Sequence, residues 1–291
     1  MNGKAKEHRG GQLREKVMQV VFLIAACISI LAVALICIYL FANGLPAIAK
    51  IGPFEFLLGT DWRPNADHYG IFPMIIGSIY VTAIAILVGV PIGLFCAVFM
   101  ARFCPKWLYR ILSPAIALLA GIPSIVYGFF GLVVMVPIMQ DLFGTGKNIL
   151  TAGILLGIMI LPTIISVSES TLRAVPDSYY EGALALGATH ERSVFFTVLP
   201  AGKSGIMAGI ILGIGRAIGE TMAVVMIAGN QPIVPNSLFS GVRTMTANIV
   251  IEMGYAADLH REALIATGVV LFVFILLINL CFSLVKRREA K

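Results

Sequence analysis

Charged side chains are scarce in this sequence. Asp, Glu, Lys and Arg make up 12% of its 291 residues, whereas apolar residues make up 59%, and soluble domains carry about 25% charged residues. The mean hydropathy is +0.95, so too little polar surface is present to cover a soluble body of this size. The composition excludes a cytosolic enzyme, a secreted domain, a coiled coil and a disordered tail, and it indicates an integral membrane protein.

Patterns for metals and nucleotides are also lacking. The five cysteines have no CxxC or Cys/His spacing, so the sequence predicts no disulfide, no metal site and no other cofactor. The four histidines lie outside the apolar runs, which disfavours metal or proton chemistry through His in the membrane. The triplet Gly202-Lys203-Ser204 ends like a P-loop, but Thr197 stands where that motif needs its first glycine. We therefore expect no ATP binding through that motif.

Six apolar runs are present, and each is close to the length of about 20 residues that crosses a bilayer. They cover residues 17–42, 71–100, 111–139, 149–167, 205–229 and 263–285. Pro114 and Pro123 could break the third run, since a proline inside a helix removes a hydrogen bond. The first run exceeds the 7–15 apolar residues of a cleaved signal peptide, so we expect an uncleaved anchor. The sequence predicts an all-α membrane protein with six transmembrane helices.

Basic residues are distributed unevenly between the two sets of connecting segments. With a cytoplasmic N-terminus, residues 1–16, 101–110, 168–204 and 286–291 are internal and carry fifteen Lys and Arg, against five on the other side. This bias follows the positive-inside rule. It predicts that both termini are cytoplasmic. The chain then divides into a basic tail (1–16), a first helix with its extracytoplasmic loop (17–69), a transmembrane domain (70–285) and a second basic tail (286–291).

The long internal segment at residues 168–204 is more than a simple connection. Its residues 179–191 have helix-forming character, and Pro176 and Asp177 before them suit the start of a helix. We expect a short cytoplasmic helix that lies across the membrane face. Periodicity alone leaves open whether it docks on a partner or is an ordinary amphipathic surface helix.

The same loop resembles the EAA loop of ABC-importer permeases, whose pattern is E-A-A, three residues, G, nine residues, I-x-L-P. Gly182 and Thr197 depart from this pattern without shifting its frame. The residues that match at the family's spacing are Glu181, Ala183, Gly187, Leu199 and Pro200. The resemblance implies that this loop is the coupling helix, which docks into a separate nucleotide-binding subunit. In that case the glycine permits a turn that a side chain would hinder.

Two further strings narrow the resemblance. Residues 121–128 read Gly-Ile-Pro-Ser-Ile-Val-Tyr-Gly, and residues 215–224 read Gly-Arg-Ala-Ile-Gly-Glu-Thr-Met-Ala-Val. Together they are similar to the phosphate-specific permeases of the PstC type, whereas the sister PstA type tends to read ETAPL in the second string. The three strings occur in the family's order, and the resemblance covers about residues 70–285.

Several expectations follow from that resemblance. It implies a type I ABC-importer permease fold in a bacterial or archaeal cytoplasmic membrane, with the chain forming half of a pathway for inorganic phosphate. The implied partners are a second permease of the PstA type, two copies of a cytoplasmic ATP-binding subunit and an extracytoplasmic phosphate-binding protein. Nucleic acid is not among them. ATP hydrolysis would belong to the ATP-binding subunit, so the chain itself would not be an enzyme.

Arg216 and Glu220 lie in the fifth apolar run, four residues apart, so in a continuous helix they would share one face and could pair. A charge at the bilayer centre costs at least ~2.5 kcal/mol, which favours a functional role. In one interpretation Arg216 meets the phosphate while Glu220 acts as its internal counter-ion. In the other, the pair only fastens this helix to its neighbours. Small residues on the same side suit close helix contact, namely Gly205, Gly209, Gly213, Ala217 and Thr221.

Ser124 and Thr163 each follow a proline within an apolar run. Their hydroxyls could serve the substrate path beside helix breaks, where backbone groups are freed. Alternatively, each hydroxyl bonds a carbonyl of its own helix, as is common in membranes. The substrate-path residues expected from the sequence are Arg216, Glu220, Ser124 and Thr163.

Two other functions compete with a phosphate permease. A permease for another oxyanion, such as sulfate or molybdate, would have the same coupling loop, and only the two span strings argue against it. An intramembrane enzyme would need a Ser/His pair, facing aspartates or a His cluster within the spans. The sequence shows no such set, so no catalytic residues are expected.

Overall fold

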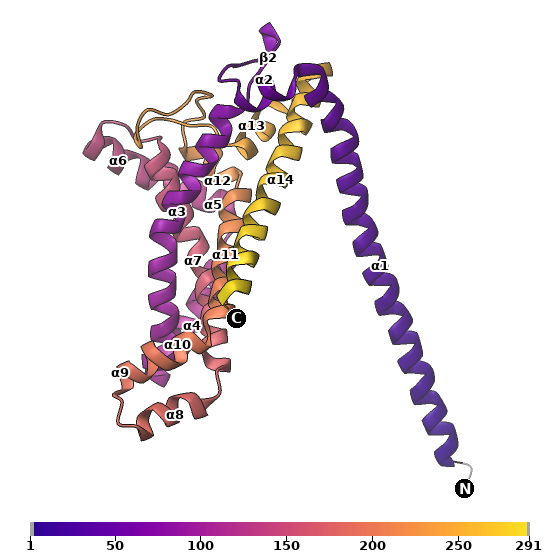
Figure 1. Cartoon of the computed structure of the whole chain (residues 1–291), viewed down its shortest axis with the longest axis vertical. Coiled ribbons are helices and arrows are strands. Elements are labelled where there is room, and N and C mark those ends of the chain that lie inside the picture. Colours follow the sequence, from indigo (N-terminus) through magenta and orange to yellow (C-terminus); the bar gives the residue numbers. More distant parts are fainter. Residues whose placement is uncertain (1–2, 290–291) are drawn as a thin grey trace.

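The computed structural model describes the backbone of residues 3–289 and the side chains of residues 15–281 and 284. The side chains of residues 1–14 and 285–291 lie outside this range, and with them most basic residues of the two predicted tails. The described chain is a bundle of helices with one short two-stranded sheet (Figure 1).

Helix α1 (Gly3–Ile51) contains the first span and leaves the bundle at a wide angle (Figure 1). The candidate span among the described side chains continues to residue 51, beyond the expected C-terminal limit of residue 42. Among its described residues, the helix contacts the bundle near its C-terminal end, where Phe41 meets Phe272 edge to face at 5.8 Å. Nearby, the Lys50 ammonium binds the Glu262 carboxylate of α14 (Asp258–Glu289) at 2.7 Å.

Helices α3 (Phe72–Val98) and α7 (Ile149–Ala174) form the centre of the bundle and correspond to the second and fourth spans. Glycines let their backbones approach closely. A Cβ atom on Gly89 would lie 2.8 Å from the carbonyl oxygen of Gly157, and one on Gly153 would lie 2.5 Å from Ile84. This is the small-residue packing typical of membrane helices. The largest buried cluster, which includes Leu155, lies along this contact.

The third apolar run is broken, as Pro123 predicted. Helix α4 (Lys106–Gly121) ends before Ile122, whose extended backbone is favoured ahead of a proline. A continuous stretch of 20 residues follows, made of α5 (Ser124–Phe130), the π-helical turn η3 (Gly131–Met135) and α6 (Val136–Phe143). The expected limits of 111–139 are therefore wrong. Pro114 lies inside α4 and does not interrupt it.

The fifth apolar run is also broken, which the sequence did not predict. Helix α11 (Lys203–Gly219) ends before Glu220, and α12 (Met222–Ile227) begins after Thr221. Five described helices are long and apolar enough to span a membrane. A sixth is obtained if the pair His190–Ala201 and Lys203–Gly219, bent by 70°, counts as one span. Counted in this way, the structure has the six spans that the sequence predicts.

The two ends of the bundle carry different structures (Figure 1). At the hairpin end, α2 (Pro53–Leu58), η1 (Pro64–Ala66) and α13 (Met245–Glu252) accompany the antiparallel strands β1 (Trp62–Arg63) and β2 (His68–Tyr69). At the opposite end lie α8 (Asp177–Ala185), α9 (His190–Ser193), the π-helical turn η4 (Val194–Val198) and α10 (Leu199–Ala201). We call residues 177–201 the docking segment.

Candidate functional site

Arg216 and Thr163, both expected in the substrate path, are neighbours in the structure. Arg216 lies in the last turn of α11, where the helix dipole favours a positive charge. Its Nη1 donates to the Thr163 hydroxyl oxygen of α7 at 3.4 Å. The bond crosses between two spans, so Thr163 is not bonded only within its own helix. The structure thus places a guanidinium and a hydroxyl together inside the bundle.

The expected helical pair of Arg216 and Glu220 is wrong. The backbone of Glu220 is extended (ψ 134°), so α11 ends at Gly219 and the two residues do not lie within one continuous helix. Among the ion pairs of the described side chains, none joins them. Instead the Glu220 carboxylate accepts the backbone N–H of Ala223 at 3.1 Å, which satisfies a free donor in the first turn of α12. Glu220 therefore has no contact that would make it a counter-ion of Arg216.

The small-residue stripe of α11 faces α7, in line with its expected role in close helix contact. A Cβ atom added to Gly205, Gly209 or Gly213 would lie 2.4, 3.1 or 2.9 Å from the nearest α7 side-chain atom. Ala217 is buried in the same direction, in the largest core cluster. Thr221, the expected fifth member, lies beyond the end of α11 and does not belong to the stripe. This packing holds Arg216 opposite Thr163.

Ser124 begins α5, directly after the break at Pro123. Its hydroxyl has no hydrogen-bond partner among the described residues, and no contact joins it to Arg216. The two broken spans nevertheless meet, because a Cβ atom on Gly128 of α5 would lie 2.9 Å from the Ala223 Cα of α12. Ser124 thus lies at the start of a half-helix that packs on the half-helix beyond Glu220.

Open space adjoins both breaks. A Cβ atom on Gly121, Gly215 or Gly219 would meet no atom within 4 Å, and none of the three has a positive φ. Neither packing within this chain nor backbone conformation therefore requires glycine at these positions. If glycine is required at these three positions, the requirement comes from a molecule outside this chain that packs against them.

The docking segment contains the turn that the sequence predicted at Gly187. Gly187 has a φ of +82°, a conformation that costs glycine little. Its N–H donates to the Leu184 carbonyl at 2.9 Å, and the Ala188 N–H donates to the Ala183 carbonyl at 3.1 Å. This pair of bonds is a Schellman motif, which ends α8 and turns the chain toward α9.

The other predicted coupling residues surround this turn. Glu181 is exposed on α8 and Ala183 is half-buried. Leu199 packs against a buried cluster that includes Val98 and Leu172, whereas Pro200 is exposed in α10. Large apolar side chains also lie on the surface of this segment: Leu186 is 91% exposed and Phe196 is 77% exposed. Exposed apolar groups at the end of a membrane bundle are typical of an interaction surface.

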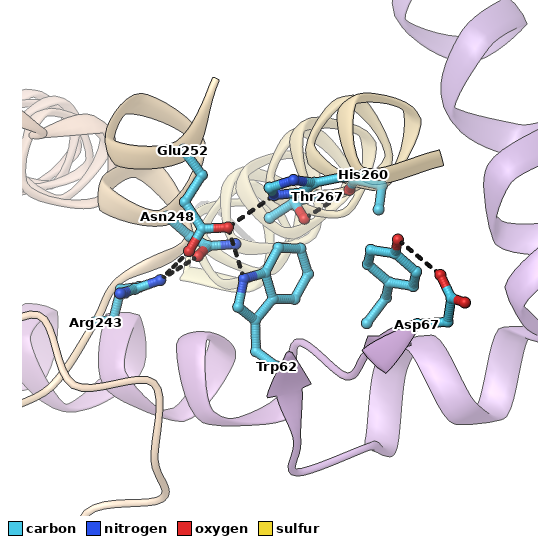
Figure 2. Close-up of polar contacts among 9 residues, drawn as sticks. Trp62, Asp67, Arg243, Asn248, Glu252, His260 and Thr267 are labelled. Atoms are coloured by element: carbon cyan, nitrogen blue, oxygen red, sulfur yellow. Dashed lines mark hydrogen bonds and ion pairs between the residues drawn. The ribbon is translucent and has the colours of Figure 1, made fainter. Parts of the chain in front are cut away.

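A buried ionic cluster at the hairpin end was missed by the sequence analysis (Figure 2). The Glu252 carboxylate accepts from the Trp62 indole N–H at 2.9 Å and from Arg243 Nη1 at 2.5 Å, and it contacts His260 Nε2 at 2.8 Å. Arg243 also donates to the Asn248 side-chain oxygen at 3.0 Å. His260 precedes the sixth apolar run of the sequence and lies in the first turn of α14. The cluster joins β1, α13, α14 and the loop before α13.

Solved structures with this fold come from ABC importers. A bacterial alginate ABC transporter has a chain that superposes with a TM-score of 0.64 at 15% identity, over 96% of this chain and 100% of that one. An inward-facing methionine ABC transporter superposes with a TM-score of 0.61 at 20% identity, over 79% and 100%. These likenesses define the class: the chain has the type I ABC-importer permease fold.

Sequence relatives identify the family. The family described as binding-protein-dependent transport system inner membrane component matches residues 89–291. A probable ABC transporter permease of Bacillus subtilis, YqgH, is 38% identical, over 92% of this chain and 91% of that protein. The phosphate transport system permease protein PstC of Mesorhizobium japonicum is 37% identical, over 87% and 84%. The chain therefore belongs to this family of multi-pass inner-membrane permeases, which work with substrate-binding and ATP-binding subunits.

Proposed function

We propose that this chain is a permease subunit of an ATP-driven importer for inorganic phosphate. Relatives named as phosphate permeases match it over most of its length. The structural observation that carries the proposal is the contact of Arg216 with Thr163, which places a cation and a hydroxyl beside broken spans. An anion in a low-dielectric interior needs such a cation, since unpaired charge there is very unfavourable. Arg216 supplies charge-assisted bonds to phosphate oxygens, and Thr163 holds the guanidinium when the path is empty.

Reconstitution tests this function. The chain is inserted into liposomes with a second permease, the ATP-binding subunit and an external phosphate-binding protein, and both ³²P uptake and ATP hydrolysis are measured. Phosphate should stimulate hydrolysis and accumulate inside the vesicles. Stimulation by sulfate or molybdate but not by phosphate would replace the proposed substrate with another oxyanion. No stimulation by any of the three would remove the oxyanion proposal.

The pathway requires a second, related permease of the PstA type. One chain supplies five or six spans, and the glycines beside the two breaks face space that this chain leaves open. A partner permease would close that side of the path. Two copies of the ATP-binding subunit then serve the two permeases. A homodimer of this chain that imports phosphate at the full rate without a second permease would contradict this arrangement.

The docking segment binds the ATP-binding subunit. A bulky residue at its Gly187 turn is expected to weaken this binding and to uncouple ATP hydrolysis from transport. Gly187→Trp places a large side chain where no neighbour within the chain opposes it, and it strains a left-handed backbone. The membrane bundle should stay folded, while copurification of the ATP-binding subunit and phosphate-stimulated hydrolysis both fall. Gly187→Asn is the matched control, because asparagine tolerates this conformation without the bulk. Parental copurification and transport in Gly187→Trp would favour an ordinary surface helix.

The orientation follows from the charge bias and places both termini and the docking segment in the cytoplasm. In a cysteine-free background, Glu191→Cys is expected to react with a membrane-impermeant thiol reagent only from the cytoplasmic side. Asp141→Cys, beside the C-terminal end of α6, should react only from outside. Both residues are exposed, so accessibility within the fold does not limit labelling. The reverse pattern would overturn the orientation.

A further inference from the structure

The π-helical turn η2 (Phe99–Phe103) ends the second span and contacts the chain on both sides of the Gly187 turn. We call residues 172–185 the first arm and residues 190–198 the second arm. Single-turn π-helical segments inside helices are frequent at functional positions. In η2 the turn is followed by Cys104 and Pro105, which end the span. Two consecutive side chains, Arg102 and Phe103, reach the docking segment from this turn.

Arg102 holds the first arm. Its Nη2 donates to the carbonyl oxygens of Leu172 at 2.9 Å and Val175 at 3.3 Å, and its Nη1 binds the Asp177 carboxylate at 3.2 Å. The Arg102 side chain is only 13% exposed, whereas Asp177 is 76% exposed, so the two carbonyls at the end of α7 are the stronger partners. Arg102 therefore fixes the point where the chain leaves the membrane for α8.

Arg173 strengthens the same junction from the opposite side. Its Nη2 donates to the Met100 carbonyl of η2 at 2.9 Å, its guanidinium lies 4.1 Å from the Tyr109 ring centroid, and Nε binds Glu169. One arginine thus reaches from η2 to α7 and another from α7 to η2. Two such crossed contacts resist relative sliding of the two spans at this end.

Phe103 holds the second arm. Its ring packs edge to face on His190 of α9 at 4.6 Å and lies 6.3 Å from Phe195 of η4. His190 Nδ1 is in turn 2.7 Å from the Tyr180 hydroxyl of α8, which ties the two arms together across the Gly187 turn. A force applied to the turn therefore reaches η2 through both arms.

Dense packing continues from η2 to the Arg216 site. Ile164, the residue after Thr163, lies between two glycines: a Cβ atom on Gly93 of α3 or on Gly213 of α11 would lie 2.9 Å from it. The backbones of α3 and α11 therefore both pack closely on α7 at this level. The spans that carry Thr163 (α7) and Arg216 (α11) are thus connected to η2 by close packing with α3.

We infer that η2 transmits motion of the docking segment to the Arg216 site, with Arg102 and Phe103 as the positioning residues. The inference rests on the proposed function, in which ATP hydrolysis by a docked subunit drives transport. Neither residue touches the substrate. Their loss should leave ATP hydrolysis in place but separate it from import.

The test is the number of phosphate ions imported per ATP hydrolysed by the complete reconstituted complex. Arg102→Gln and Phe103→Ala are each expected to lower this ratio about tenfold, within the usual range of coupling between distant sites. Arg102→Lys, which keeps a donor for the carbonyls, should give an intermediate ratio. Arg110→Gln is the matched control, since Arg110 is an exposed cation of the same inner region with no partner among the described residues, and it should keep the parental ratio.

A purely structural role would lower the amount of assembled complex and leave the ratio of the surviving complex unchanged. An unchanged ratio in Arg102→Gln would overturn the inference. If that variant does not assemble, Phe103→Ala decides in the same way, because Phe103 is only half-buried. An incorrect substrate assignment gives a different result from an incorrect role of η2, because the parent complex itself would then import no phosphate. In that case the number of ions imported per ATP is measured with the oxyanion that does stimulate hydrolysis.

Discussion

Arg216→Gln is expected to reduce phosphate uptake more than tenfold while the complex still assembles. The change removes the positive charge beside the two broken spans, and a bound anion loses a charge-assisted bond worth roughly 1.5–3 kcal/mol. Glutamine is too short to keep the contact with Thr163, but the glycine contacts between α11 and α7 do not involve this side chain, so their packing should survive. Initial rates of ³²P uptake in proteoliposomes measure the effect.

Two comparisons show whether charge is responsible. Arg216→Lys retains the charge but not the two-pronged geometry, so its uptake should lie between those of the parent and Arg216→Gln. Phosphate should also protect the parent against thermal unfolding more than it protects Arg216→Gln. Parental uptake and protection in Arg216→Gln, in a complex of normal composition, would show that Arg216 is not an anion site.

The sequence predicted the spans well where a signal was local. Apolar length found the six runs, and Pro123 predicted the break before α5 because proline constrains the residue ahead of it. The break at Glu220 carried no proline. Arg216 and Glu220 were therefore placed on one helix, although the backbone leaves the helical conformation at Glu220. Spacing in the sequence cannot show where such a run stops being helical.

The docking segment was predictable only in part: the helical stretch expected over residues 179–191 is interrupted between α8 and α9, and the turn came from the family resemblance. Gly187 was expected to permit a turn, and it adopts the left-handed conformation of a Schellman motif. What the sequence could not show was how this segment is held. Arg102 is 70 residues from Leu172, and Phe103 is far from His190 in the chain, so neither contact leaves a periodic signal.

The contacts at the hairpin end were even less predictable from the sequence, because they join residues still farther apart in the chain. Trp62 and Glu252 are 190 residues apart, and each looks like an ordinary loop residue in the sequence. Only folding brings the indole, Arg243 and His260 around one carboxylate (Figure 2). A buried carboxylate that contacts three separate segments holds them together, so its loss should destabilise the hairpin end.

Glu252→Gln is expected to destabilise the hairpin end by about 3–5 kcal/mol, the usual result of breaking a buried ion pair. The Glu252 and Arg243 side chains are only 8% and 13% exposed, so solvent cannot compensate the guanidinium once its partner is neutral. The amide oxygen of glutamine can still accept one bond, but its NH₂ group brings a further donor to a place already filled with donors.

Trp62 offers a local reporter for this change. The chain has two tryptophans, so Trp107→Phe leaves Trp62 as the only one, and its fluorescence follows the cluster during thermal unfolding. Glu262→Gln is the matched control, because it neutralises a carboxylate at the same end whose partner Lys50 is 58% exposed. A surface pair of that kind contributes about 0–1 kcal/mol. Glu252→Gln should therefore unfold at a clearly lower temperature than Glu262→Gln, and equal midpoints would show that the buried cluster does not fasten the hairpin end.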